Sequence, residues 1–299
     1  MIKSLNELLT LAKDKGGKTI SVAVAQDTVV LEAIKRAEAL GIAKAILVGD
    51  KEKIEAAAKE VGMDLTRFEV VDEKDEIKAC DVAVDLVTEG RAQLVMKGLI
   101  DTSVILKSIL RKEANLRTGK VLSHVAVFEI ERYHKLLFVT DAAMNIAPEV
   151  DHKRQIIENT VDVAHALGIE MPKVAVVCAK EKVSDKMVAT QDAEALEAMN
   201  KLGKITGCIV GGPFALDNAI SAEAAHHKGI SHPVAGEADI LLMPDIEAGN
   251  ILYKALTYFA GAENAGIIVG AKVPIVLTSR ADSDAAKLNS IALGVLAAN

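Results

Sequence analysis

The chain has 299 residues, of which 51 % are hydrophobic, and its formal net charge is −7 at pH 7. Aromatic residues make up only 3 %, Trp is absent, and Lys and Arg form no block, so a nucleic-acid surface is disfavoured. No run approaches the eighteen or so apolar residues of a membrane helix. The amphipathic N-terminus lacks the features of a signal peptide, and we expect a cytoplasmic protein.

Short apolar runs that are typical of strands alternate with amphipathic helical patterns along nearly the whole chain. The expected strands are 19–25, 45–49, 67–71, 93–97, 121–128, 136–140, 173–178, 208–211, 239–243 and 274–278. Several, such as S-V-A-V-A and V-A-V-V-C, are continuously apolar, which suits parallel strands covered on both faces. The alternation predicts an α/β protein built from right-handed βαβ units.

A change in character near the middle of the chain suggests two domains. All six prolines lie after residue 147, and the segment I-E-R-Y-H-K-L-L-F-V-T-D is typical of a new hairpin or crossover. We therefore predict a domain boundary near Phe128–Arg132.

Cysteines and histidines give little sign of chemistry. Three widely spaced cysteines lie in apolar runs, where we expect core residues and not disulfides or zinc ligands: Cys80, Cys178 and Cys208. His226, His227 and His232 are close in sequence, but adjacent histidines on a helix diverge by about 100°. We therefore predict no metal site.

The polar turns at strand ends are the places to look for a ligand, because ligands collect beyond the carboxyl ends of parallel strands. Five such turns are M-K-G-L-I-D-T-S (96–103), V-T-D-A-A-M-N (139–145), V-G-G-P-F-A-L-D-N-A (210–219), M-P-D-I-E-A-G-N (243–250) and L-T-S-R-A-D-S-D (277–284). The nucleophile elbow of hydrolases, the dinucleotide fingerprint and the P-loop are all absent from the sequence.

The turn at 277–284 offers the strongest anion site. A helix starting near Asp282 or Ser283 presents unpaired N–H groups and the positive end of its dipole. Arg280 adds a planar fork suited to phosphate, and Ser279 adds a hydroxyl. The alternative is that Asp282 or Ser283 only caps the helix while Arg280 pairs with an acid.

Three other turns carry candidate groups, each with a structural alternative. The glycine-proline turn permits close approach of a ligand but also suits a strand end, and the aspartate before a helix is also a cap. The candidate pairs, one in each of these three turns, are Asp141 and Asn145, Gly212 and Pro213, and Asp245 and Asn250.

In their order along the chain, these motifs resemble the phosphate acetyl/butyryltransferase family from about Ser4 to the C-terminus. The resemblance implies two doubly wound α/β domains with a cleft between them, similar to isocitrate and isopropylmalate dehydrogenases. Domain I is expected at residues 1–129, with the C-terminal helix 280–299 packing back on it, and domain II at 130–279. The resemblance also implies a homodimer or a higher homo-oligomer.

The reaction implied by the resemblance is reversible transfer of an acyl group between coenzyme A and inorganic phosphate, by direct attack in a ternary complex. Coenzyme A is then a substrate, and no tightly bound cofactor or metal is expected. Arg280 and the helix N-terminus would hold phosphate, and Ser279 would bind the thiol or the oxyanion. Asp284, or else Asp282, would take the thiol proton.

Further positions carry over by matching turns. Lys107 stands where a family arginine is expected to meet phosphate, Arg132 is a less certain cation, and the rest would line the cleft. The full expected substrate-binding set is Gly98, Thr102, Ser103, Lys107, Arg132, Asp141, Asn145, Gly212, Pro213, Asp245 and Asn250.

Three positions depart from the acetyl-transferring pattern. Ala142 replaces a cysteine, Tyr258 replaces an arginine, and Ala286 replaces an acid. The first two departures favour the butyryl-transferring branch and a longer acyl chain. The missing arginine and acid leave open a non-catalytic relative that binds coenzyme A or a phosphorylated ligand. An acetyl-transferring enzyme of the same family is the other alternative. A dehydrogenase is disfavoured, because metal-binding aspartates are not evident at the expected turns.

Overall fold

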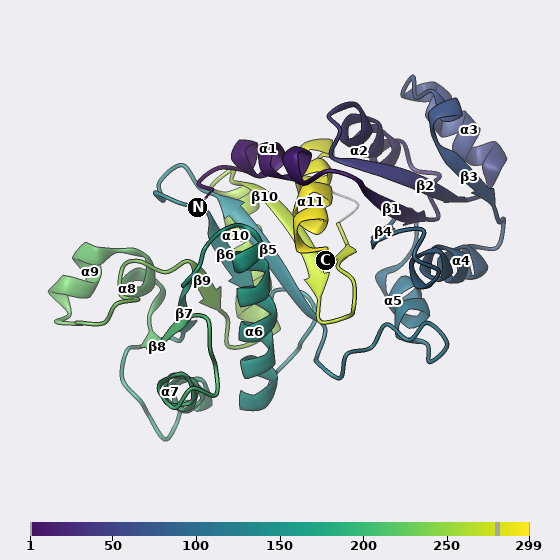
Figure 1. Cartoon of the computed structure of the whole chain (residues 1–299). Helices are drawn as coiled ribbons and strands as arrows, with labels where there is room; N and C mark the ends of the chain where they lie inside the picture. Colours follow the sequence, from purple (N-terminus) through teal and green to yellow (C-terminus); the bar gives the residue numbers. More distant parts are fainter. Residues whose placement is uncertain (1, 279–281, 299) are drawn as a thin grey trace. The chain divides into compact units, whose positions relative to one another are not determined.

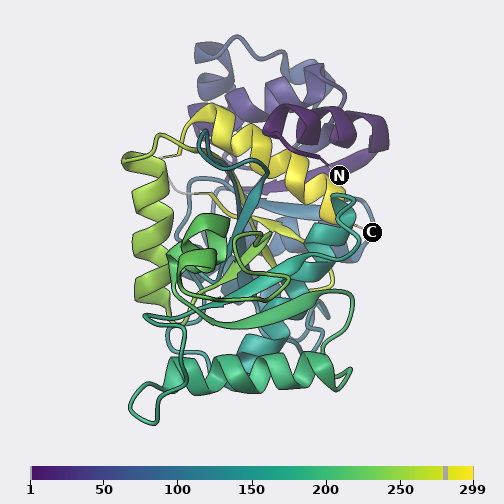
Figure 2. The ribbon, with the colours of Figure 1, turned by 90° about the vertical axis from the view of Figure 1, so that its left-hand side faces the viewer.

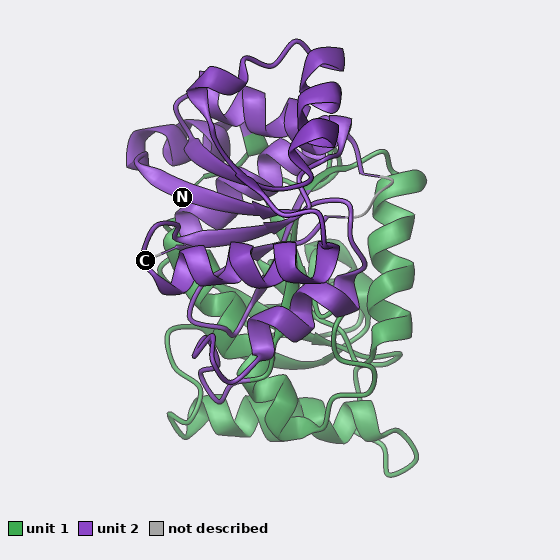
Figure 3. Cartoon of the chain, turned by 90° about the vertical axis from the view of Figure 1, so that its right-hand side faces the viewer, with its two compact units in different colours: residues 1–5, 121–264 green, residues 6–120, 265–299 purple. Residues whose placement is uncertain are grey.

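The computed structural model describes residues 2–278 and 282–298. The chain divides into two compact units, each made of two segments (Figure 3). Unit 1 comprises Met1–Leu5 and Val121–Asn264, and unit 2 comprises Asn6–Lys120 and Ala265–Asn299. The expected boundaries were 129/130 and 279/280, whereas the units change at 120/121 and 264/265.

Unit 2 is built on a mostly parallel sheet (Figure 1). Its strands are β1 (Lys18–Ala23), β2 (Ala43–Gly49), β3 (Glu69–Asp72), β4 (Leu94–Lys97), β10 (Glu263–Val269) and β11 (Ile275–Val276). They lie in the order β3-β2-β1-β4-β11-β10. Every resolved pairing from β3 to β11 is parallel, while β10 runs antiparallel to β11 with Ile268 opposite Ile275.

The helices of unit 2 connect and cover these strands. They are α1 (Leu5–Lys15), α2 (Thr28–Ala39), α3 (Lys51–Glu60), the short 3₁₀ helix Leu65–Arg67, α4 (Glu76–Thr88), α5 (Thr102–Leu110) and α11 (Asp284–Ala297). Helices α2 and α11 pack on each other, as do α4 and α5. Asp27, Asp50 and Asp75 cap α2, α3 and α4 by accepting backbone N–H bonds, which fixes where each helix begins after its strand.

Unit 1 also has a mixed sheet. Its strands are β5 (Ser123–Glu129), β6 (Leu137–Thr140), β7 (Lys173–Val177), β8 (Ile209–Phe214) and β9 (Ile240–Leu242), in the order β5-β6-β9-β7-β8. Strands β5 and β6 form an antiparallel hairpin, and the other pairs are parallel. Of the hairpin and the crossover expected for the segment after Phe128, the hairpin is present, and both of its strands belong to unit 1.

The helices of unit 1 are α6 (Val150–Ala166), α7 (Val188–Lys201), α8 (Leu216–Ile220), α9 (Ala222–His227) and α10 (Ile246–Tyr258). Phe128, Val139, Phe214 and Leu241 belong to its buried apolar core. All ten expected strands are present near their expected positions, so the α/β prediction is confirmed. The expectation omitted β10.

Candidate functional site

In unit 2 strand β4 ends in a buried lysine. The Lys97 ammonium donates to the carbonyls of Gly98, at 3.2 Å, and Ile100, at 3.0 Å. A positive charge is therefore fixed at the carboxyl end of β4, beside the M-K-G turn. Lys97 was not among the expected site residues, although a lysine at the end of a buried strand was a visible signal in the sequence.

Gly98 is required by packing against the end of β1. A Cβ at this position would lie 2.2 Å from the Val24 carbonyl oxygen and 2.6 Å from that of Ala23. The Gly98 N–H donates to the Ala23 carbonyl at 2.8 Å, and the Leu99 N–H donates to the Val24 carbonyl at 2.9 Å. The turn is thus held on β1 by its backbone, and no side chain fits between them.

Three expected residues follow on α5. Thr102 and Ser103 occupy its first turn, and Lys107 lies one turn beyond Ser103 on the same face. Ser103 and Lys107 are both exposed. Their side chains can meet a ligand from solvent without any rearrangement of the core.

The turn at 277–284 begins beside the same loop, because Val276 of β11 pairs with Met96 of β4. Ser279 and Arg280, the expected anion-binding pair, lie outside the described residues. Helix α11 begins at Asp284, and the Ser283 hydroxyl caps it by accepting the Ala286 N–H at 3.1 Å. The predicted helix start is confirmed.

Two side chains that we did not anticipate hold this turn. Arg36 of α2 forms a 2.5 Å ion pair with Asp284, the expected proton acceptor. Buried Lys287 donates to the backbone carbonyl of Asp282 at 2.9 Å. Burial lowers the pKa of Lys287, while Asp282, Asp27 and Asp284 act in the opposite direction. The first turn of α11 is therefore a cluster of charges, with carboxylates gathered around one buried ammonium.

In unit 1 the V-T-D-A-A-M-N turn is closed by its own aspartate. Buried Asp141 accepts the N–H groups of Ala143, Met144 and Asn145 at 2.8–3.2 Å, and the Asn145 side-chain amide at 2.6 Å. The same amide donates to the Leu122 carbonyl at 2.8 Å. These two residues build the turn.

The M-P-D-I-E-A-G-N turn packs directly on this loop. Asp245 caps α10 by accepting the Ala248 N–H at 2.8 Å, and the Asn250 amide donates to the Ala142 carbonyl at 3.2 Å. Between them, a Cβ on Gly249 would lie 2.4 Å from the Asp141 carbonyl oxygen. Two motifs that are a hundred residues apart in the sequence therefore form one substructure.

The remaining candidates of unit 1 are less closely grouped. Gly212 and Pro213, joined by a cis peptide, lie inside β8, and the space beside Gly212 is occupied by Val176 and Ala193. Arg132 is exposed in the β5–β6 connection.

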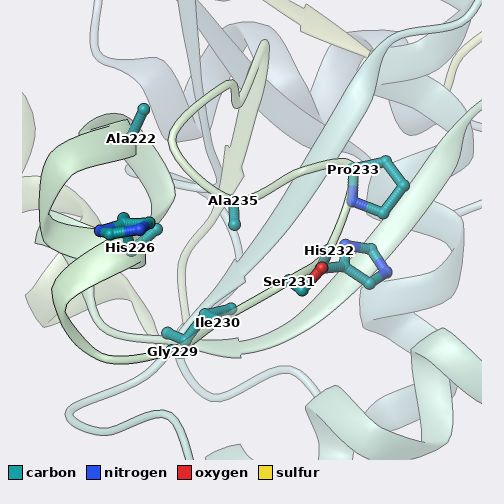
Figure 4. A pocket seen from close by; sticks show the side chains of 9 residues that line it. Ala222, His226, Gly229, Ile230, Ser231, His232, Pro233 and Ala235 are labelled. Carbon is teal, nitrogen blue, oxygen red and sulfur yellow. The ribbon is translucent and has the colours of Figure 1, made fainter.

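A separate cavity of about 660 Å³ lies beside α9, lined in part by His226, Ser231 and His232 (Figure 4). The His232 ring packs against Phe214, and the Val234 N–H donates to its Nδ1 at 3.2 Å. None of the expected site residues lines this cavity.

Within residues 2–278 and 282–298, no group of three His, Cys, Asp or Glu side chains is arranged to hold a metal ion. No helix in that part of the chain is long and apolar enough to cross a membrane. All three cysteines are buried and carry free thiols, which confirms their expected place in the core.

Comparison with known proteins identifies the family. The model of the phosphate acetyl/butaryl transferase family matches residues 4–82 and 76–295. The chain belongs to this family. A phosphate butyryltransferase of Clostridium acetobutylicum is 55 % identical over 100 % of this chain and 99 % of its own length. A phosphate acetyltransferase of Thermotoga maritima is 46 % identical over 98 % of this chain and 99 % of its own.

Solved structures agree with this assignment. A branched-chain phosphotransacylase from Enterococcus faecalis, 37 % identical, matches 94 % of this chain and 99 % of its own with a TM-score of 0.84. A putative 4-hydroxythreonine-4-phosphate dehydrogenase from Salmonella typhimurium, only 12 % identical, matches 94 % of this chain and 100 % of its own with a TM-score of 0.59. The second likeness shows that the fold is shared with dehydrogenases, as the sequence resemblance implied.

Proposed function

We propose that the protein is a phosphate butyryltransferase, which interconverts butanoyl-CoA plus phosphate with butanoyl phosphate plus CoA. The observation that carries the proposal is the full-length identity of 55 % with a relative of that name. Coenzyme A and phosphate are then substrates, and the chemistry uses no tightly bound cofactor. We place the reaction in the cytoplasm.

The proposed roles combine the sequence with the geometry of unit 2. Arg280 and the N-terminus of α11 bind phosphate, and Ser279 donates to the thiol or to the oxyanion of the tetrahedral intermediate. Asp284 at the start of α11 is our first choice as the acceptor of the thiol proton, with Asp282 as the alternative. Lys97, beside the loop after β4, and Lys107, on α5, add further positive charge in unit 2.

A direct assay tests the activity. Butyryl-CoA is mixed with the protein and phosphate, and released CoA is measured with a chromogenic thiol reagent. The buried cysteines of the protein keep the background low. We expect thiol release that requires phosphate; release no greater than in the phosphate-free control would refute the function.

Single substitutions then test the assigned roles. Arg280→Ala should lose most of kcat/KM, whereas Arg67→Ala, a surface residue paired with Glu38, should not. An Arg280→Ala variant within about threefold of wild type, or ~0.7 kcal/mol, would discard its role. Asp284→Asn and Asp282→Asn are compared by the acid limb of the pH–rate profile, which should vanish in the variant that lacks the base.

A second candidate is a phosphate acyltransferase with a different acyl preference, favoured by the 46 % identity with a phosphate acetyltransferase. The values of kcat/KM for acetyl-, butyryl- and branched acyl-CoA decide between them, because each methylene in an apolar pocket is worth roughly 1–3 kcal/mol. We further propose a homodimer or higher homo-oligomer. Several large apolar side chains exposed on and near α10 support this.

A further inference from the structure

The loop after β1, residues 24–27, lies where open α/β sheets bind ligands. From β1 the chain first builds β2 and β3 on one side and then returns to place β4 on the other side, in the order β3-β2-β1-β4. Ligands collect beyond the carboxyl ends of the two strands at such a change of direction, here β1 and β4. The turn after β4 carries the expected site residue Gly98, whereas no site residue was expected in the loop after β1.

Contacts on both sides place this loop beside motifs that we assign to the substrate site. The Val24 carbonyl accepts the Leu99 N–H of the M-K-G turn at 2.9 Å. Helix α2, which follows the loop, packs on α11, the yellow helix beside the purple N-terminal helices in Figure 2. Burial lowers the pKa of Lys287 in α11 and Asp27 opposes that shift, so the Asp27 carboxylate lies within electrostatic range of this ammonium. Lys287 in turn donates to the Asp282 carbonyl.

The loop contains two features that cost free energy. Val24 is β-branched, yet its φ of +54° lies in the left-handed region. The Gln26 Oε1 atom is buried and accepts no hydrogen bond from the described residues. It fills the space beside Gly49 of β2, where a Cβ would lie 2.2 Å from it. Two such costs within one short loop point to a functional reason and not to a need of the fold.

The unpaired oxygen of Gln26 requires a donor, and the substrates differ in what they offer. The residue is only half-buried and no donor holds its oxygen, so the amide can turn toward a ligand without breaking a hydrogen bond at that atom. Phosphate presents mainly acceptor oxygens at neutral pH and is matched by cations and helix N-termini. Coenzyme A carries N–H donors in the amides of its pantetheine arm and in its adenine amino group. An amide oxygen therefore suits coenzyme A and not phosphate.

We propose that Gln26 is a substrate-binding residue whose amide oxygen accepts a hydrogen bond from an N–H group of coenzyme A. This role rests on the proposed function, which makes coenzyme A a substrate. The free protein keeps the oxygen unpaired at a cost in stability, and the bound substrate supplies the missing donor. The loop after β1 is then a third wall of the substrate site in unit 2, together with the turn after β4 and the turn at 277–284.

A second glutamine in unit 2 provides the matched control. Gln93, also half-buried and directly before β4, accepts the Thr19 N–H at 2.9 Å and donates to the Gly90 carbonyl at 3.4 Å. Gln26→Met and Gln93→Met both remove the amide and keep the length of the side chain. In urea unfolding, Gln26→Met should have a midpoint equal to or above that of wild type, because it removes an unpaired buried oxygen. Gln93→Met should have a lower midpoint, because it breaks hydrogen bonds of the fold.

Binding and turnover should respond in the opposite order. Titration calorimetry with coenzyme A alone should show a dissociation constant raised about fivefold or more in Gln26→Met and unchanged within about twofold in Gln93→Met. Under turnover, kcat/KM for butyryl-CoA should fall by a similar factor in Gln26→Met, while KM for phosphate stays within about twofold. Gln26→Leu is a second variant, and circular dichroism confirms that each variant is folded.

Three results would overturn this role of Gln26. They are a wild type that does not bind coenzyme A, Gln26 variants with unchanged affinity for it, and a urea midpoint lowered in Gln26→Met as far as in Gln93→Met. A change in KM for phosphate alone would likewise contradict the choice of coenzyme A. Because binding is measured without turnover, an inactive wild type would refute the proposed reaction, whereas the dissociation constants for coenzyme A still decide the role of Gln26.

Discussion

Replacing Gly98 by alanine should destabilise unit 2 through a collision with the backbone. The new Cβ would lie 2.2 Å from the Val24 carbonyl oxygen, where ordinary van der Waals contact begins near 3.4 Å. The loop must therefore retreat by about an ångström, because the obstacle is backbone and not the end of a flexible side chain.

The cost can be built up from the contacts that this retreat disturbs. Overpacking of this kind costs roughly 1–3 kcal/mol. The hydrogen bonds from Gly98 and Leu99 to β1 lengthen together, and each is worth about 0.5–1.5 kcal/mol. We expect a loss of about 2–6 kcal/mol from the free energy of unfolding. Activity should fall with it, since the turn borders the proposed phosphate site.

Urea unfolding followed by far-ultraviolet circular dichroism measures the loss. Trp is absent, and Tyr133, Tyr253 and Tyr258 all lie in unit 1, so tyrosine fluorescence would report on the other unit. Gly119→Ala is the control in unit 2, where φ is +85° and nothing lies within 4 Å of the added Cβ. It should cost only the left-handed penalty of roughly 1–2 kcal/mol. If Gly98→Ala loses no more than this control, the collision is not what fixes the glycine.

Other predictions concern unit 1 and the thiols. Asp141→Ala should lower the free energy of unfolding by about 2–4 kcal/mol, because it removes the acceptor of several hydrogen bonds within the turn. Urea unfolding measures this loss, and a smaller loss would show that the Asp141 carboxylate is not required to hold the turn. Burial lowers the pKa of His232 below its usual 6.5, with Glu197 opposing. The unfolded chain thus binds a proton first as the pH falls through 6.5, and stability should drop there in wild type but not in His232→Asn. Burial raises the pKa of Cys80 to about 12 and those of Cys178 and Cys208 to about 11, so a thiol reagent should react slowly with the native protein and rapidly in denaturant; fast native labelling would contradict this.

The strand–helix alternation and the start of α11 could be read from the sequence because both depend on local signals. Continuously apolar runs marked the strands, and Ser283 is a typical cap. Strand β10 was missed because its E-N-A-G start is polar and glycine-containing, and its pairing partner β11 follows only after a turn. The sequence pattern contains the residues of β10 but not their pairing with β11 in the sheet.

What the sequence could not predict depends on contacts between distant segments. The ion pair of Arg36 with Asp284 joins helices 248 residues apart, and the packing of Gly249 on the Asp141 turn joins two separate motifs. A lone arginine on an amphipathic helix has many alternative partners. Only the fold selects one of them.

The motif residues therefore divide into two groups with different expected phenotypes. Asp141 and Asn145 bond their own turn and hold it against α10, so their loss should appear first as lost stability. Ser103 and Lys107 lie exposed on one face of α5, where truncation opens no cavity and breaks no core contact. If Ser103 and Lys107 meet the substrate, alanine at these two positions should lower kcat/KM at unchanged unfolding free energy. Equal effects on both quantities at Ser103 and Lys107 would mean that these side chains support the fold and do not meet the substrate.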